Sequence, residues 1–232
     1  MKRKTRLKVK KILNIVLISS LSISCWEVGK KQFQYIENQS THKKIIKEKE
    51  KIVKEQGIQK YLYNKDYEWI EVSGTLIDYP LVIASDNQYY LTHDHTGEVN
   101  IAGAIYYDAT DEPYNNKLTV IYGHSMRDGT MFNNLHYFRK DVSRFRKSEL
   151  TISSIYGVET FKPLGFAIYD ANNPFYRKLD TASPEEITSV LGENCTFLNS
   201  DMEITDNTHI MALVTCEYSI DDGRLVVFYI SQ

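Results

Sequence analysis

A succession of short apolar segments, separated by turn residues, runs from Tyr61 to the end of the chain. Segments such as WIEV, LTVIY and LVVFY are rich in β-branched and aromatic residues and have the length of strands, not of buried helices. About eight such segments, in a chain with 17 tyrosines, predict a mainly β fold. So many short strands with few helices favour a closed or nearly closed barrel.

Two segments interrupt the strand pattern and are predicted to be helical. Residues 131–147 carry apolar side chains at helical spacing, and His136 among them is expected to face solvent. Residues 183–198 begin with Ser183 as the N-cap, followed by proline in the first turn. We therefore expect helices at the periphery of the barrel.

The charge of the chain is divided between its two ends. Residues 1–60 carry 16 lysines and arginines against 5 acidic residues, whereas residues 61–232 carry 12 against 25. Because an acidic domain repels nucleic-acid phosphates, we expect no nucleic-acid partner. The basic end requires a different explanation.

The first residues have the layout of a membrane-targeting segment. Residues 1–11 contain seven basic residues, and the uncharged, mostly apolar run Ile12–Trp26 follows. We expect a basic cytoplasmic end at 1–11 and a signal-anchor or transmembrane segment at 12–28. The protein would then lie in the cell membrane, single-pass, with its bulk extracellular. Since the run is short for a spanning helix, a cleaved signal peptide is an alternative, and Cys25 also hints at a lipoprotein site.

Residues 29–60 are predicted to form a helical linker. The pairs Ile45-Ile46 and Ile52-Val53 lie seven residues apart, on one helical face, among many lysines and glutamates. We expect a solvated helix that connects the membrane segment to a folded domain at residues 61–232, since a coiled coil would need more heptads.

Cys216 ends the apolar segment MALVTC, and Arg224 opens the segment that returns after an Asp-Asp-Gly turn. A nucleophilic cysteine needs a partner that keeps it as thiolate and a group that stabilises the oxyanion formed on attack. A cysteine at a strand end is more often inert, so the hairpin by itself leaves both interpretations open. We expect Cys195 and Cys216 to be free, because a disulfide between them would block a reactive thiol.

His124 is the histidine best placed to serve as that partner. It follows the apolar segment LTVIY, so its ring is presented at a strand end, where reactive groups are often found. His93 and His95 form an H-x-H pair, but no acidic or cysteine ligand stands nearby at metal-site spacing. We therefore expect no metal site.

Together, IYGHSMRDGTMFNNL and LVTCEYSIDDGR closely resemble the class B sortases, membrane-anchored cysteine transpeptidases of Gram-positive bacteria. The segments YEWIEVSGTLIDYPLV, SDNQYYL and GAIYYD support the resemblance, which covers roughly residues 60–232. It implies a sortase-like closed eight-stranded β-barrel with peripheral helices and an N-terminal helical linker, with residues 61–232 as the catalytic domain.

The resemblance also implies roles for three residues. Cys216 would be the nucleophile that attacks the threonine carbonyl of a sorting-signal peptide, giving a thioester acyl-enzyme. His124 would protonate the departing amine and later deprotonate the incoming one. Arg224 would hold the substrate backbone or the oxyanion with its fixed fork and permanent charge.

The implied partners are surface proteins with a C-terminal sorting signal and an amino group on a peptidoglycan precursor or a pilin subunit. No cofactor is implied. Five residues match family positions that line the peptide groove: Asn87, Leu91, Tyr122, Thr215 and Glu217.

Two residues depart from the family pattern. Val214 stands where many relatives have Ser, and Tyr218 stands where some have an Asp proposed as a third catalytic group. Two alternative functions stay open. A thiol hydrolase or peptidase would use the same site and release the acyl group to water, and a binding module would keep the barrel without catalysis.

Overall fold

The computed structural model describes residues 2–110, 117–174, 176, 183, 186–187, 189, 191, 196–199, 204–205 and 208–231, apart from the side chains of residues 2–9 and 12. By its internal contacts the chain divides into two compact units, Met1–Thr41 and His42–Gln232. The first unit is helical over its described residues and forms the beginning of α1 (Lys2–Gln56). None of the helices in the described part of the chain contains a stretch both long and apolar enough to cross a membrane.

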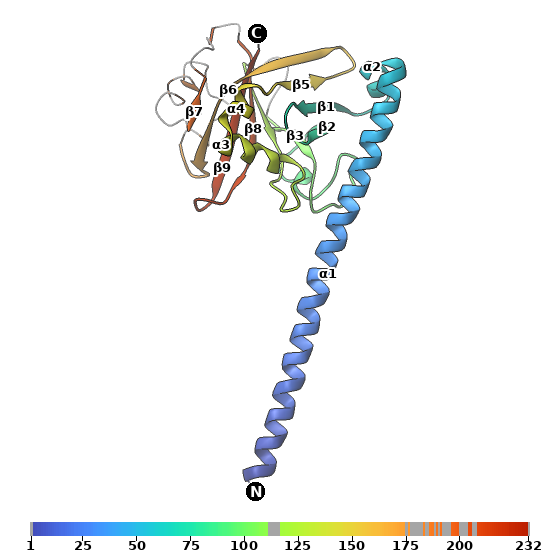
Figure 1. Ribbon diagram of the computed structural model, residues 1–232, viewed down its shortest axis with the longest axis vertical. Coiled ribbons are helices and arrows are strands. Elements are labelled where there is room, and N and C mark those ends of the chain that lie inside the picture. The colour runs from blue at the N-terminus through green and yellow to red at the C-terminus, as the bar shows by residue number, and fades with distance from the viewer. Residues whose placement is uncertain are drawn as a thin grey trace. The chain divides into compact units, whose positions relative to one another are not determined.

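The second unit contains the end of α1, nine described strands and several short helices (Figure 1). In chain order the elements after α1 are α2 (Ile58–Leu62), β1 (Tyr67–Val72), β2 (Ile77–Ile83), η1 (Tyr89–Leu91), β3 (Ile105–Tyr107), β4 (Leu118–Tyr122), η2 (Phe132–Leu135), α3 (His136–Lys140), α4 (Val142–Arg146), β5 (Leu150–Ser153), β6 (Val158–Asp170), β7 (Phe197–Leu198), β8 (Ile210–Glu217) and β9 (Gly223–Ser231).

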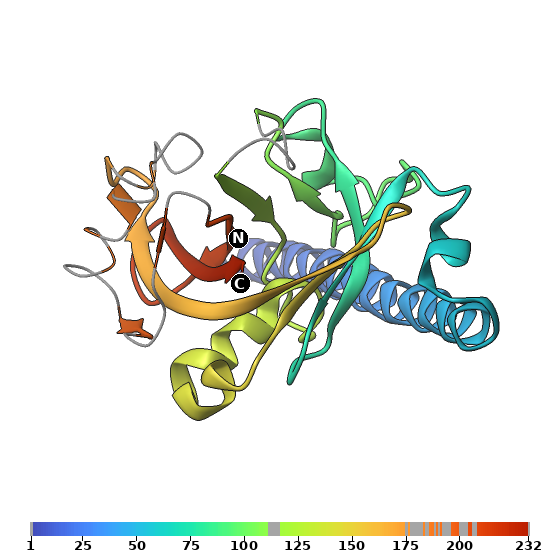
Figure 2. The ribbon, with the colours of Figure 1, turned by 90° about the horizontal axis from the view of Figure 1, so that it is seen from above.

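Eight of these strands close into a barrel, which confirms the predicted fold class. They follow the order β5-β1-β2-β3-β4-β8-β9-β6, β6 pairs back with β5, and the short β7 is added to β6 outside the ring. The pairs β2–β3 and β4–β8 are parallel. The long, curved β6 (orange in Figure 2) closes the ring, because its first residues pair with β5 and the rest with β9. Closure leaves these eight strands without an exposed sheet edge.

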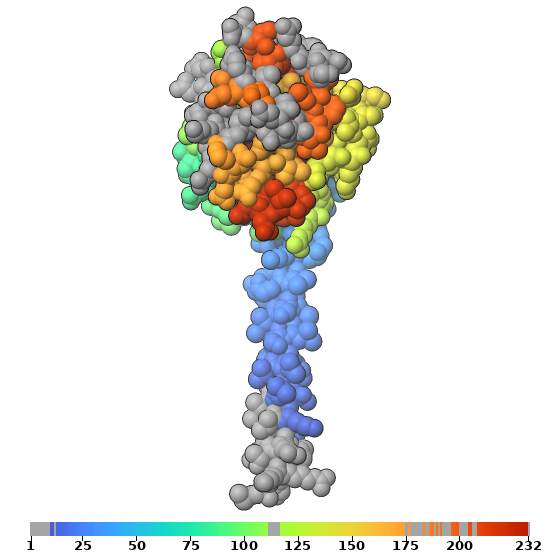
Figure 3. Space-filling view, turned by 90° about the vertical axis from the view of Figure 1, so that its left-hand side faces the viewer, coloured from blue at the N-terminus to red at the C-terminus, as the bar shows by residue number. Residues whose placement is uncertain are grey.

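β8 and β9 are buried on both faces, and this explains why their sequences are continuously apolar instead of alternating. Ala212 and Val214 of β8 belong to one core cluster with Val226 and Phe228 of β9. Within β8 only Cys216 is less than fully buried. The strand therefore brings its cysteine to the surface at a defined point. In Figure 3 the β8–β9 hairpin (red) adjoins the carboxyl end of β6 (orange) on the molecular surface.

The helical segment predicted at 131–147 is divided into η2, α3 and α4. Asp141 leaves the helical conformation at the end of α3, and its side chain accepts a hydrogen bond from the Arg144 N–H at 3.1 Å, which caps α4. Phe145 of α4 packs its ring against Phe166 of β6 and Tyr229 of β9, with centroids 5.3 and 5.9 Å apart. These helices therefore cover the outside of the barrel, as predicted.

Half of the second predicted helix, 183–198, lies outside the described residues, and its predicted end is wrong, because Phe197–Leu198 forms β7. Its expected cap is present, because Ser183 Oγ accepts from the Glu186 N–H at 3.2 Å and the Ser183 N–H donates to the Glu186 carboxylate at 2.8 Å.

The last turns of α1, within the second unit, are not solvated on every side. Lys49 is buried; it pairs with Glu71 and Asp78, and its Nζ lies 4.6 Å from the ring centroid of Trp69. The prediction of a solvated helix is wrong here, because the apolar face that it recognised is partly buried against α2 and β1. The side chains of that face pack on the cluster of Tyr61, Leu62 and Trp69, and they are Ile45, Ile46, Ile52 and Val53.

Candidate active site

Cys216 and Arg224 stand directly opposite each other in the β8–β9 hairpin. Opposed residues of an antiparallel pair point to the same face, with Cβ atoms about 4.5–5.5 Å apart. Both side chains are half-buried. The hairpin therefore places a thiol and a permanent positive charge side by side, as its sequence predicted.

The Arg224 guanidinium is held by the backbone of the two residues before it. Nη1 donates to the carbonyl oxygens of Asp222 at 3.1 Å and Gly223 at 2.9 Å, and the side chain also hydrogen-bonds to the Tyr176 hydroxyl. Burial raises the pKa of Tyr176, and the nearby Arg224 charge partly opposes this. Tyr176 lies between β6 and β7, so the connection between these strands contributes to the site.

His124 reaches the same region from β4. The parallel β4–β8 ladder ends with Tyr122 opposite Val214, and His124 and Cys216 each stand two residues further along. Two contacts extend the ladder beyond this pair: the Gly123 N–H donates to the Val214 carbonyl at 3.1 Å, and the Thr215 hydroxyl donates to the Gly123 carbonyl at 2.7 Å. The histidine and the cysteine therefore leave neighbouring strands at the same level.

The His124 ring has a defined hydrogen-bond partner in η1. Its Nε2 lies 2.9 Å from the carbonyl oxygen of Leu91. Because a carbonyl can only accept, Nε2 carries a hydrogen in this arrangement. In a neutral ring, Nδ1 is then the nitrogen without a hydrogen and can accept a hydrogen bond.

Asn87 and Tyr122, two predicted groove residues, meet at Asp108. The Asn87 amide donates to the Asp108 carboxylate at 2.9 Å, and the Tyr122 hydroxyl also hydrogen-bonds to it. Although burial alone would raise it, the pKa of Asp108 is lowered, because Thr110, Asn87 and Tyr122 donate to the carboxylate. Asp108 is buried, and sequence analysis did not select it, since its partners come from separate segments of the chain.

Two tyrosines, Tyr106 and Tyr176, are close enough to the thiol to be affected by its charge. The rings of Tyr106 and Tyr122 lie 5.6 Å apart. Burial raises the pKa of Tyr106 and of Tyr176, and the proximity of Cys216 raises both further. Tyr106 itself is buried, whereas Tyr122 and Tyr176 are half-buried. Leu91, which is 39% exposed, lies near His124.

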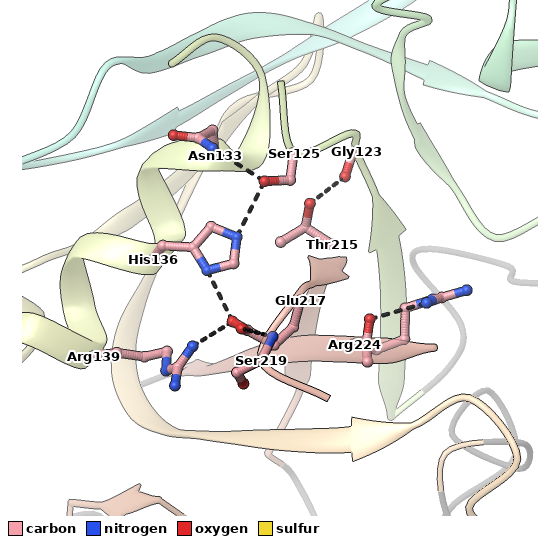
Figure 4. Close-up of polar contacts among 10 residues, drawn as sticks. Gly123, Ser125, Asn133, His136, Arg139, Thr215, Glu217, Ser219 and Arg224 are labelled. Atoms are coloured by element: carbon pink, nitrogen blue, oxygen red, sulfur yellow. Dashed lines mark hydrogen bonds and ion pairs between the residues drawn. The ribbon is translucent and has the colours of Figure 1, made fainter. Parts of the chain in front are cut away.

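Thr215 and Glu217, also predicted to line the groove, are buried. They flank Cys216 in β8, so their side chains point to the opposite face of the strand. The Thr215 hydroxyl bonds to Gly123, and the Glu217 carboxylate pairs with Arg139 and with His136 Nδ1. The prediction that His136 faces solvent is wrong, because its ring lies between β8 and the turn after β4 (Figure 4).

Cys216 is a free cysteine, as predicted, and Cys195 lies outside the described residues. His93 stacks on Tyr89 with ring centroids 4.0 Å apart, and His95 packs edge-on against Tyr67. Across the part of the chain that the structure describes, no three His, Cys, Asp or Glu side chains gather in a way that could hold a metal ion.

The chain is similar to known proteins over the whole region that carries this site. The family model for the sortase domain matches residues 70–229. Sortase B of Listeria monocytogenes is 29% identical over 237 residues, 94% of either chain. Sortase B of Staphylococcus aureus is 32% identical over 171 residues, 71% of this chain and 69% of the relative. A crystal structure of S. aureus sortase B has a TM-score of 0.67 at 27% identity, covering 84% of this chain and 97% of the other.

Proposed function

The chain belongs to the sortase family, whose class B members are cysteine transpeptidases at the cell surface, and from this premise we propose that Cys216, His124 and Arg224 are its catalytic residues. The observation that carries the assignment is the register of β8. It sets Cys216 opposite Arg224 on one side and level with His124 on the other.

The proposed reaction is acyl transfer in two halves. The Cys216 thiolate attacks the carbonyl carbon of the threonine in a sorting-signal peptide, and the oxyanion that forms accepts hydrogen bonds from Arg224. The C–N bond then breaks as His124 gives its proton to the departing amine, which leaves a thioester on Cys216. In the second half, an acceptor amine gives a proton to His124 and attacks the thioester, so the thiolate is released and an amide bond is formed.

The peptide would lie in the groove lined by Asn87, Leu91 and Tyr122. Asn87 and Tyr122 both hydrogen-bond to Asp108, which holds their side chains in place beside the proposed groove. Thr215 and Glu217 would contribute through their backbone, since their side chains are buried. We propose surface proteins with a C-terminal sorting signal as donors and an amine of a peptidoglycan precursor or a pilin subunit as acceptor.

The segment at 12–28, together with the linker at 29–60, would hold the catalytic domain at the outer face of the cell membrane. This arrangement is tested by separating the membrane fraction from the medium and then measuring the mass of the protein's amino-terminal peptide. An intact terminus in the membrane fraction supports a signal-anchor, whereas a shortened one indicates cleavage.

The test of function uses quenched sorting-signal peptides with LPxTG-like and NPxTx-like motifs, each with and without an oligoglycine or diamino-acid acceptor. We expect cleavage that requires Cys216 and yields ligated product when an acceptor is present. Hydrolysed peptide alone would favour the thiol hydrolase. No cleavage of any peptide, with no adduct on Cys216, would favour the binding module.

A further inference from the structure

A chain of polar contacts connects the segments that carry Cys216 and His124 (Figure 4). It joins the residues that follow them, Glu217 and Ser125, through the ring of His136. Nε2 of this ring lies 3.1 Å from Ser125 Oγ, and Nδ1 lies 3.1 Å from Glu217 Oε2. The same ring also hydrogen-bonds to the backbone of Cys216. One side chain therefore spans from the turn after β4 to the end of β8.

The donors and acceptors of this chain fit one arrangement with a neutral ring. The Glu217 carboxylate can only accept, so Nδ1 of His136 donates to it and Nε2 accepts from the Ser125 hydroxyl. The Ser125 oxygen in turn accepts from Asn133 Nδ2 at 3.1 Å. Burial lowers the pKa of His136, although the Glu217 charge opposes this, and the neutral ring is favoured.

The charge of Glu217 is balanced without His136. Arg139 of α3 donates to the carboxylate, and the Ser219 N–H donates to its other oxygen at 2.8 Å. Burial alone would raise the pKa of Glu217, but the bonds from Ser219 and Arg139 lower it, so the group is ionised. The His136 ring can therefore stay uncharged and connect the two segments, with Nε2 bonded to Ser125 and Nδ1 bonded to Glu217.

Strand pairing does not extend to His124. The last residue pair of the β4–β8 ladder is Tyr122 with Val214. Beyond it, the Thr215 hydroxyl holds Gly123, and the Phe132 N–H donates to the His124 carbonyl at 2.9 Å. The bond between His136 and Ser125 then connects the turn to Glu217 of β8. A shift of this turn would move His124 relative to Cys216.

We infer that His136 is a positioning residue: it holds the His124 turn and the Cys216 strand end at a fixed separation, through Ser125 and Glu217. This inference rests on the proposed function, because it assumes that His124 and Cys216 act together. It predicts that loss of the ring impairs the chemical step and leaves substrate binding unchanged.

The test compares His136→Ala with the full wild-type chain in the peptide transfer assay. A displacement of about 1 Å at reacting groups costs on the order of a hundredfold in rate, so we expect kcat to fall by about ten- to a hundredfold with KM within about twofold. His136→Gln should restore most of kcat, because its amide can accept from Ser125 and donate to Glu217.

The matched control is His209→Ala. His209 is a half-buried histidine just before the amino end of β8, where its Nε2 lies 2.9 Å from Thr119 Oγ1, away from the site. Its loss should leave kcat within about twofold of wild type. If His136→Ala also stays within that range, or if His136→Gln is as impaired as His136→Ala, the inference is overturned.

Two further measurements keep the test decisive. If His136→Ala does not fold, Ser125→Ala removes only the hydroxyl on the His124 side. A fall in kcat at constant KM then supports the inference, and an unchanged kcat overturns it.

If the wild-type protein transfers no peptide, the proposed function fails separately. In that case, the positioning role of His136 is tested by the rate at which iodoacetamide modifies Cys216, followed by peptide mass. It should fall in His124→Ala and in His136→Ala alike, and an unchanged rate in His136→Ala would refute the positioning role.

Discussion

Gly123 lies between Tyr122 and His124, and the substitution Gly123→Ala would test how tightly the turn packs behind the site. A Cβ there would lie 2.7 Å from Cδ2 and 2.8 Å from Cγ of Phe132, which is fully buried. Carbon atoms in contact prefer about 3.5–4.0 Å, so the turn or the ring must move by about 1 Å. Overpacking of this kind costs about 1–3 kcal/mol. In a domain of this size, Gly123→Ala should lower Tm by about 2–12 °C.

Thermal unfolding followed by circular dichroism, together with the peptide transfer assay, checks this prediction. Gly123→Ala/Phe132→Leu should recover part of the loss in Tm, because the smaller side chain leaves room for the methyl group. The control is Gly157→Ala, where a Cβ would meet no atom within 4 Å, and its Tm should stay close to wild type. Since His124 is the next residue, activity should fall with Tm. Equal Tm values for Gly123→Ala and Gly157→Ala would refute the packing argument.

Arg224→Lys should lower kcat/KM by about ten- to a hundredfold in the peptide assay, because an ammonium cannot reproduce the two-pronged geometry of the guanidinium; activity equal to wild type would remove Arg224 from the mechanism. Tyr79→Phe should cost about 1–3 kcal/mol in urea unfolding, since the Tyr79 hydroxyl is 3.0 Å from the N–H of Met131, a donor that would be left unpaired. Tyr156→Phe, at an 88% exposed position, should cost nothing measurable. Burial lowers the pKa of His209, so below about pH 6.5 the unfolded chain binds a proton that the folded chain does not, and stability falls as pH falls. His209→Gln should make Tm less dependent on pH between about pH 7 and 5, and an unchanged slope would contradict this.

The barrel and the hairpin of Cys216 and Arg224 could be predicted because their signals are local. An apolar segment of strand length, bounded by turn residues, identifies a strand wherever its partners lie. The Asp-Asp-Gly turn also fixed which two segments pair, so Arg224 could be placed beside Cys216 before its register was known. His124 was identified because it follows such a segment directly.

The buried polar contacts could not be predicted, because their partners are distant in the sequence. His136 appeared to be a surface residue, yet its partner Glu217 is supplied by β8. Lys49 appeared to belong to a solvated helix, yet its acidic partners come from β1 and β2. Helical periodicity identifies an apolar face, but it does not tell which polar side chain a distant strand will bury.

For Thr215 and Glu217, the sequence alone was enough to predict that the side chains point away from the face of Cys216. Side chains alternate along a strand, so residues on either side of a surface-facing Cys216 must point to the other face. Their burial in β8 follows from this rule. Resemblance indicated that these positions lie near the substrate, whereas the strand period indicates which atoms can reach it.

The most direct test of the central claim is the intact mass of the protein during reaction with a sorting-signal peptide and no acceptor. We expect an added mass equal to the acyl fragment that ends at threonine, mapped to Cys216, absent in Cys216→Ala and lost when an acceptor amine is added. An adduct that persists in Cys216→Ala, or one that maps to another residue, would contradict the assignment of Cys216 as the nucleophile.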